Sequence, residues 1–399
     1  MTDQAHSPKG ASSAERWLHC PGSSVLLAQL KLPETDEPDY RGLGTGAHEA
    51  AAKCLLEGID SWEIVGERFH GFELGEPGKC AEGKERIDFN AVQMYVNDAR
   101  QFMTNSATVY IERRIGEDPE KRPHPDFYGT VDFAAYDTNE TIVEDFKYGE
   151  GIVVEPEWNE QMLYYAYGIL ISRPSVRSDR VVRLRICQPR AFHVDGPIRE
   201  WEITAGEIIH WGETVLIPAM NAAEIDNDFD AGSWCRFCPA KLFCPLLSGI
   251  FGAAAKADPA ALPNFSNKRI GLEYQQRDAV KFYMQALEAE AYRRLMTGAE
   301  VQGIKLVNKK SNRVWKEGAP AIFAERFGQD AYTPAEIKTP AEMERVSPDA
   351  KKLVAEFAYH PNTGFTVALA DDRRQAVKIE KVEDTFAHMI PKDDADAAS

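Results

Sequence analysis

"GTVDFAAYDTNETIVEDFK", residues 129–147, contains two β-rich runs on either side of a polar turn. If residues 137–140 form the turn, residue 136 faces residue 141, and the same pairing continued outward places Asp132 opposite Asp145. Facing side chains hold their Cβ atoms about 4.5–5.5 Å apart, and like charges there destabilise a hairpin. A divalent cation would neutralise the pair. A β-bulge in either strand would shift this pairing.

The residues beside Asp145 extend the pattern. Side chains alternate along a strand, so Lys147 shares the face of Asp145 while Glu144 and Phe146 point to the other face. Mg²⁺ accepts one or two carboxylates and leaves its other positions to water and substrate phosphate. A lysine beside such an ion can orient an attacking water, which predicts metal-assisted phosphodiester hydrolysis. The alternative is a solvent-facing hairpin with hydrated charges, because acid-x-Lys triplets also occur elsewhere in the chain.

The segments around the hairpin predict an α/β fold. Residues 44–58 read as a helix with His48 on its inner face, and residues 107–115 read as a strand. A helix over 156–172 and a strand over 180–188 follow the hairpin. The expected order is helix, three strands, helix, strand, with one extra helix inserted over residues 88–105.

Three cysteines are close together in a loop rich in proline. Cys235, Cys238 and Cys244 have the spacing Cys-x2-Cys-x5-Cys, and Cys20 stands before a proline far upstream, at the end of a predicted helix. This spacing suits metal binding better than a disulfide framework. Structural zinc is one natural occupant, with Cys20 or a nearby histidine as fourth ligand. The three other cysteines, Cys54, Cys80 and Cys187, have no partner at a ligand spacing.

Composition limits the function classes. The 399 residues carry a formal charge of −17, which argues against a protein that coats nucleic acid non-specifically. A local basic stretch over residues 305–316 is the candidate contact, or simply a solvated basic turn or hairpin. The start of the chain has no signal-peptide pattern and no run of about 18 apolar residues occurs, so we expect a cytoplasmic protein without membrane contact.

Three motifs together resemble the PD-(D/E)XK nuclease superfamily in its RecB-like and AddB-like branch. The motifs are "GTVD", "EDFK" and "QMLYY". The resemblance implies an αβββαβ core with helical insertions and an active site of Asp132, Asp145, Lys147, Gln161 and Tyr165. It also implies that His48 joins Asp132 and Asp145 as a metal ligand, although Gly46 stands two residues before His48 and not three.

The resemblance also bears on the cysteines. Members of this branch, including CRISPR-adaptation nucleases, carry one cysteine before the core and Cys-x2-Cys-x5-Cys after it, and bind a 4Fe-4S cluster. Cys20, Cys235, Cys238 and Cys244 would hold that cluster here. Structural zinc remains the alternative, because ligand softness alone does not decide between the two.

The expected domains are a RecB-like nuclease over residues 10–254, a smaller α+β region over 255–390 and a disordered acidic tail over 391–399. The C-terminal third resembles the end of a phage and prophage family, which would place the protein in a host cytoplasm. The expected function is a Mg²⁺- or Mn²⁺-dependent DNA exonuclease acting on ends or single strands. A phage recombinase or single-strand annealing protein is a candidate partner. The rivals are a non-catalytic DNA-binding or assembly module and a zinc-stabilised nuclease.

Overall fold

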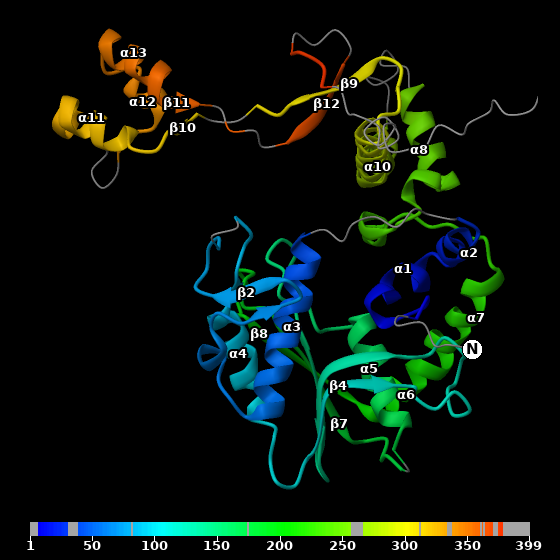
Figure 1. Cartoon of the computed structure of the whole chain (residues 1–399). Coiled ribbons are helices and arrows are strands. Elements are labelled where there is room, and N and C mark those ends of the chain that lie inside the picture. The colour runs from blue at the N-terminus through cyan, green and yellow to red at the C-terminus, as the bar shows by residue number, and fades with distance from the viewer. Residues whose placement is uncertain are drawn as a thin grey trace, which may run out of the picture. The chain divides into compact units, whose positions relative to one another are not determined.

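The chain divides into two compact units, Met1–Phe282 and Tyr283–Ser399. The computed structural model describes residues 7–30, 39–80, 83–173, 175–256, 266–310, 313–332, 337–359, 361, 364–369 and 374–377 (Figure 1). The division falls inside a helix, α10 (Arg277–Met296), farther along the chain than the boundary expected after residue 254. The expected acidic tail, 391–399, lies outside the described residues.

A five-stranded sheet is the centre of the first unit. Its strands lie in chain order, and all neighbours are antiparallel except the third and fourth, which are parallel. The strands are β4 (Thr108–Ile115), β5 (Gly129–Tyr136), β6 (Glu140–Phe146), β7 (Val181–Cys187) and β8 (Ile198–Thr204). The fold is therefore mixed α/β, and β8 is an additional strand that the sequence reading did not include.

The predicted hairpin forms with the predicted register. Tyr136 pairs with Thr141, and the ladder continues as far as Phe133 opposite Glu144. There the regular pairing ends, one position before Asp132 and Asp145. The backbone N–H of Phe146 instead donates to Asp132 Oδ2 at 2.8 Å. The expected direct opposition of the two aspartates is thus replaced by a side-chain bond across the strand ends.

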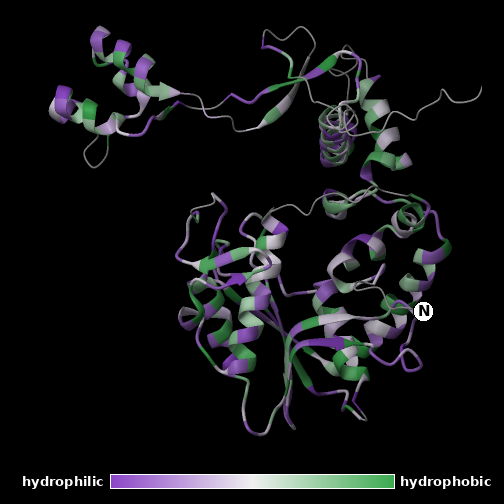
Figure 2. Cartoon of the chain, in the orientation of Figure 1, coloured by the Kyte–Doolittle hydropathy of each residue, from purple (hydrophilic) through white to green (hydrophobic). Residues whose placement is uncertain are grey.

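Helices cover both faces of the sheet (Figure 1). On one face lie α3 (Asp39–Glu57) and α4 (Phe89–Arg100), packed on a core that includes Phe133 and Phe146. The other face is covered by α1 (Ala14–His19), α5 (Glu160–Ile171), α6 (Ala205–Trp211) and α7 (Ile217–Ile225). Figure 2 shows hydrophobic and hydrophilic residues mixed along these helices, as helices with one buried side require.

The start of α3 differs from the prediction. The helix begins at Asp39, before the expected start at residue 44, so Thr45 lies inside it. The Thr45 hydroxyl donates to the Arg41 carbonyl one turn back at 3.2 Å. Between α3 and α4 the chain forms a small three-stranded sheet of short strands, β1 (Arg68–Phe69), β2 (Phe72–Gly75) and β3 (Ile87–Asp88).

Further helices follow in the first unit, and the second unit has strands and helices of its own. Helix α9 (Asn267–Gln275) precedes α10 and is separated from it by Gln276. In the second unit β9 (Ile304–Asn308) pairs with β12 (Phe365–Leu369), and β10 (Val314–Trp315) pairs with β11 (Ala358–Tyr359). A basic hairpin over 305–316 is therefore wrong, since β9 and β10 have other partners. Helices α11 (Ala319–Phe327), α12 (Pro340–Met343) and α13 (Pro348–Phe357) surround buried Phe323.

Candidate metal centre and cysteine group

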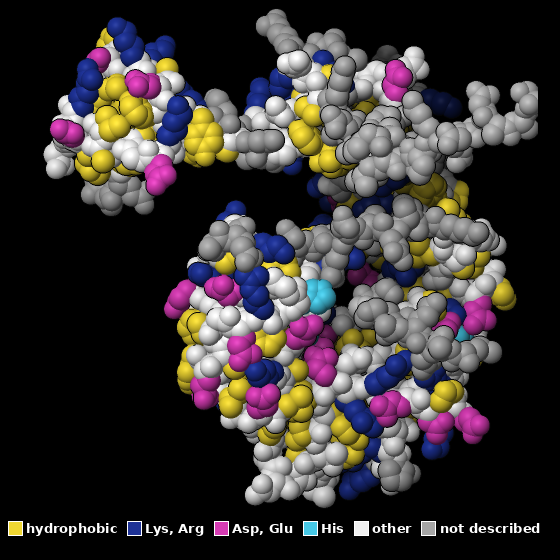
Figure 3. All heavy atoms as spheres, in the orientation of Figure 1, with side chains coloured by type: hydrophobic (Ala, Val, Ile, Leu, Met, Phe, Trp, Pro, Cys, Tyr) yellow, Lys and Arg dark blue, Asp and Glu magenta, His cyan; other side chains and the backbone are white. Residues whose placement is uncertain are grey.

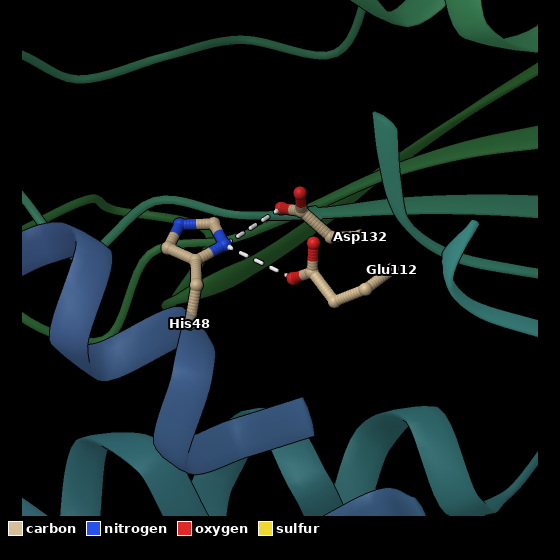
Figure 4. Close-up of side chains that lie close together, drawn as sticks. All are labelled: His48, Glu112 and Asp132. Carbon is tan, nitrogen blue, oxygen red and sulfur yellow. Dashed lines mark ion pairs between the residues drawn. The ribbon is translucent and has the colours of Figure 1, made fainter. Parts of the chain in front are cut away.

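The candidate metal centre depends on a close approach of α3 to its neighbours. Gly46 lies against β1 so tightly that a Cβ added there would sit 2.6 Å from the Phe69 carbonyl oxygen. Only glycine fits this contact without a backbone shift. Two residues later His48 projects from the same helix toward the strand ends (Figure 4). The inward direction predicted for His48 is confirmed.

Two carboxylates face the same nitrogen of His48. His48 Nδ1 lies 3.3 Å from Asp132 Oδ2 and 3.8 Å from Glu112 Oε1 (Figure 4). All three atoms lie within 4.8 Å of one another. Two ligands bound at about 2.1 Å to one Mg²⁺ are at most about 4.2 Å apart, so both separations measured at His48 are compatible with a shared ion. One nitrogen and two oxygens leave several positions of an octahedral ion for other ligands.

Glu112 is the residue that the sequence reading missed. It lies inside β4 at φ +46°, while its neighbours Ile111 and Arg113 pair regularly with Phe133 and Val131. The same register puts Glu112 opposite Asp132, but the left-handed backbone takes Glu112 out of the ladder. A non-glycine residue in this conformation is strained, and such strain is typical of functional sites. The sequence shows an acid in the neighbouring predicted strand, but its position opposite Asp132 follows only from the β4–β5 register.

The electrostatics of the centre favour a cation. Burial alone would lower the pKa of His48, but Asp132, Glu112 and the nearby Asp145 raise it to about 10. Burial raises the pKa of Glu112 above its ordinary value, and neighbouring Asp132 adds to the shift against the pull of His48. The pKa of Asp132 is lowered despite burial, because His48 and the Phe146 N–H stabilise its charged form. Three acids thus hold a proton on His48 in the absence of metal.

The other predicted site residues form a hydrogen-bonded group next to this centre. Lys147 Nζ lies 2.9 Å from Asp145 Oδ2 and donates to Gln161 Oε1 at 2.7 Å. The Gln161 amide donates to Asp145 Oδ1 at 2.8 Å and also lies 3.3 Å from the Tyr165 hydroxyl. Lys147 is therefore held by two partners. Asp145 is 2% exposed, and its oxygens are not among the three atoms that gather at His48.

Local structure fixes the direction of Gln161 and Tyr165. Asn159 caps α5, its side-chain oxygen accepting from the Met162 N–H at 3.1 Å. Gln161 and Tyr165 then lie one helical turn apart on the face directed at the sheet. Burial keeps the pKa of Tyr165 well above its ordinary value, so the hydroxyl stays neutral at physiological pH.

Glu144 lies away from the site, as predicted. Its fully buried carboxylate approaches the guanidinium of Arg185 at 3.7 Å, and Arg185 also lies 2.6 Å from Asp98 of α4. Burial and neighbouring Asp98 raise the pKa of Glu144 well above its ordinary value. Asp145 and Glu144 therefore serve opposite faces of β6.

The four candidate ligand cysteines come together from two distant segments. Cys20 joins α1 to α2 (Pro21–Gln29), while Cys235 and Cys238 lie in or after a 3-10 turn over Ser233–Phe237. Cys244 precedes α8 (Pro245–Ala255). All four are buried. Cys20 and Cys244 each raise the pKa of Cys235 and of Cys238, although burial is the larger cause.

Two observations describe what this cysteine group could hold. The charges of Arg16 and Lys241 act on the thiols, with Arg16 near Cys20 and Cys238. Among the described residues, no group of three ligand atoms within 4.8 Å includes a cysteine sulfur. Thiolates bound to one zinc at about 2.3 Å would lie about 3.8 Å apart. In any three of the four sulfurs, at least one pair is therefore farther apart than two ligands of one zinc ion.

A second histidine–carboxylate group holds a lysine. His124, Asp126 and Glu224 bring ligand atoms within 4.8 Å of one another. Buried Lys9 places its ammonium 2.6 Å from Asp126 and 3.1 Å from Glu224. Burial and the charge of Lys9 lower the pKa of His124. The Lys9 ammonium therefore supplies the cation of this group and links the N-terminal segment to α7.

These features define a mixed α/β protein with a histidine–carboxylate centre beside a buried lysine network and a four-cysteine group. The chain belongs to the DUF2800 family, described as proteins of unknown function, whose profile matches residues 6–375. In the described part of the chain, no helix combines the length and apolar character needed to cross a membrane.

Proposed function

We propose that this protein is a metal-dependent deoxyribonuclease of the PD-(D/E)XK type. One observation carries the proposal: His48, Glu112 and Asp132 gather ligand atoms at ion-sized separations beside Lys147, which Asp145 and Gln161 hold in place. With β1, β2, β3 and α4 inserted after α3, the order α3, β4, β5, β6, α5, β7 supports it, because the αβββαβ core implied by the motifs has the same sequence of elements.

Each residue of the candidate site has a separate proposed role. His48, Glu112 and Asp132 would hold Mg²⁺ or Mn²⁺, with Asp145 completing the acidic side of the centre. The cation would supply Lewis-acid polarisation of a phosphodiester. Lys147 would orient the attacking water and stabilise developing negative charge, since an ammonium near the reacting group favours the transition state. Gln161 positions Lys147 and Asp145 at once, and Tyr165 supports Gln161.

DNA ends or single strands are the proposed substrates, and exonuclease action in phage recombination or end processing is the proposed role. The overall charge of −17 requires phosphate attraction to be local. In the view of Figure 3, acidic and basic side chains are interspersed over the surface of the first unit. The cation and Lys147 would then supply the main attraction at the scissile phosphate.

A 4Fe-4S cluster is the proposed occupant of the cysteine group, held by Cys20, Cys235, Cys238 and Cys244. The spacing of Cys235, Cys238 and Cys244 together with the upstream Cys20 supports this cluster, because it is the pattern found in the nuclease branch that the motifs resemble, and Arg16 and Lys241 would offset part of its negative charge. Its role is structural, because it would join the segment before the sheet to the segment after it.

The test uses end-labelled linear DNA and closed circular DNA with Mn²⁺ or Mg²⁺. We expect the wild type to degrade linear DNA, while Asp132→Asn and Lys147→Ala degrade none and keep the circular dichroism spectrum of the wild type. Lys121→Ala is the matched control, because Lys121 is 83% exposed and pairs with Asp118, away from the site. Equal cleavage by the wild type and Lys147→Ala, or no cleavage by any of them, would overturn the proposal and favour a non-catalytic DNA-binding module.

A further inference from the structure

A cavity of about 560 Å³ opens beside the proposed catalytic lysine. Lys147 and Gln161 form part of its wall, and the segment that joins β6 to α5 forms another part. The loop that carries Cys235 and Cys238 also lines the cavity, through Ser233, Arg236 and Phe237. The volume lies within the range of about 300–1,000 Å³ that is usual for pockets binding small organic groups.

Two aromatic side chains that line this cavity are exposed to solvent, although aromatic side chains are usually buried. Trp158 is 55% exposed and Phe237 is 59% exposed. Trp158 packs against Trp201, with ring centroids 5.0 Å apart, so Trp201 supports one side of the Trp158 ring. Its backbone is left-handed at φ +51°, a strained conformation for a tryptophan. The neighbouring Ile152 and Val153 are also exposed and line the same cavity.

Glutamates outnumber the lysine and arginine side chains that line the cavity, which disfavours a phosphate in its interior. Four glutamates line the cavity, Glu15, Glu155, Glu157 and Glu160, against the cations of Lys147 and Arg236. A phosphodiester backbone would be repelled by this set. A nucleobase is uncharged, stacks on aromatic rings, and in adenine, cytosine and guanine offers amino donors that carboxylates accept.

We propose that this cavity seats an unpaired nucleobase of the strand whose phosphate lies at the metal centre, stacked on Trp158 and Phe237. The inference rests on the proposed nuclease function and deepens it. A base enters the cavity only after it leaves its stack, so the substrate must be single-stranded or frayed at the point of cleavage. Trp158 and Phe237 are thus substrate-binding residues, and Lys147 connects their cavity to the reacting phosphate.

The test measures binding without cleavage. Full-length protein carrying Asp132→Asn is titrated, with a chelator present, into a fluorescein-labelled oligodeoxyadenylate and into an abasic oligonucleotide of the same length. The two ligands have the same phosphates, and only the first has bases. We expect Trp158→Ala to weaken binding of the oligodeoxyadenylate by about tenfold, since stacking of one base is worth about that much, and to leave abasic binding unchanged.

Matched variants separate stacking from folding and charge. Trp158→Phe keeps a ring and is expected to restore most of the affinity, and Phe237→Ala should act as Trp158→Ala does. Trp62→Ala is the control, because Trp62 is 54% exposed and lies outside the cavity. Arg236→Ala should weaken both ligands together and reduce the salt dependence. An equal loss for both ligands in Trp158→Ala, or no loss, would overturn the inference.

The two proposals fail separately. Binding of oligodeoxyadenylate that depends on Trp158, in a protein whose wild type cuts no DNA, would retain the base site and overturn the nuclease. Cleavage that depends on Lys147, with binding indifferent to Trp158 and Phe237, would retain the nuclease and overturn the base site.

Discussion

Glu112 lies directly across the β4–β5 pair from Asp132, and both carboxylates approach the same nitrogen of His48. The relationship depends on the left-handed backbone of Glu112, because a regular strand residue would continue the ladder. Two acids on adjacent strands repel each other, and the helix α3 places a histidine between them. A cation bound at this centre would offset the repulsion between the two acids.

Removing the charge of Glu112 should weaken metal binding. Glu112→Gln keeps the size of the side chain but removes one carboxylate from the centre, so we expect Mn²⁺ affinity to fall at least about tenfold, about 1.4 kcal/mol. Isothermal titration calorimetry measures it. Glu117→Gln is the control, because this substitution makes the same charge change at an exposed residue that pairs with Arg113. Wild-type affinity in Glu112→Gln would remove Glu112 from the ligand set.

Metal-free stability should depend on pH through His48. Its pKa is about 10 in the folded protein against 6.5 when unperturbed, so its stabilising charge is fully present below pH 6.5 and is lost as pH rises through 10. The difference in free energy of unfolding between the wild type and His48→Gln should therefore decrease as the pH rises from 6.5 to 10. Urea denaturation in a chelator at several pH values measures the difference. A difference independent of pH would contradict the raised pKa.

The same proton should appear in metal binding. A histidine ligand must be neutral, so Mn²⁺ must displace the proton that the three carboxylates hold on His48. We expect release of about one proton per ion at pH 7–8 and affinity that rises with pH. Calorimetry in two buffers of different ionisation enthalpy counts the protons. Binding without proton release in the wild type, or identical release in His48→Gln, would place the ion elsewhere.

Gln161 should affect turnover more than metal binding. Gln161→Leu removes the amide that holds Lys147 and Asp145 together, and a displaced catalytic group costs about a hundredfold in rate. Single-turnover cleavage of labelled DNA measures the rate, and Mn²⁺ calorimetry should change little. Gln101→Leu is the control, because the Gln101 amide bonds to Asp98 away from the site. A rate unchanged in Gln161→Leu would show that Lys147 needs no such support.

Cys20 should be needed for the cluster despite its distance along the chain. Protein purified without oxygen from Cys20→Ser should lose most of its iron and acid-labile sulfide and unfold at lower temperature, because the cluster joins distant segments. Cys80→Ser should keep both, since Cys80 is also buried but lies apart from the other cysteines in the sequence. Wild-type protein with zinc and no iron would replace the iron–sulfur proposal with structural zinc.

Gly44 and Gly46 both lie in α3, and their alanine substitutions can be compared directly. A Cβ at Gly44 meets nothing within 4 Å, whereas a Cβ at Gly46 would lie 2.6 Å from the Phe69 oxygen. Gly44→Ala should raise the free energy of unfolding by about 0.5–1 kcal/mol through helix propensity. Gly46→Ala should lower it and weaken Mn²⁺ binding, because the displaced helix carries His48. Thermal unfolding and calorimetry together distinguish the two, and equal behaviour would contradict the close packing.

The local part of the site followed from the sequence. Alternation along a strand placed Lys147 with Asp145 and turned Glu144 away, and a short turn with β-rich flanks fixed the register from Tyr136–Thr141 to Phe133–Glu144. One helical turn put Gln161 and Tyr165 on the same face. These relationships depend on backbone geometry over a few residues, which the order of residue types already specifies.

The tertiary structure decided what spans distant segments. Glu112 became a candidate ligand only through its position opposite Asp132 and its left-handed backbone, and no local pattern marks either property. The addition of β8 to the sheet, the end of the ladder before Asp132 and the meeting of Cys20 with the later cysteines likewise depend on how separate elements pack. Sequence spacing determined which side chains could act together, and long-range packing decided which of them meet, because contacts between distant segments depend on the whole folded chain.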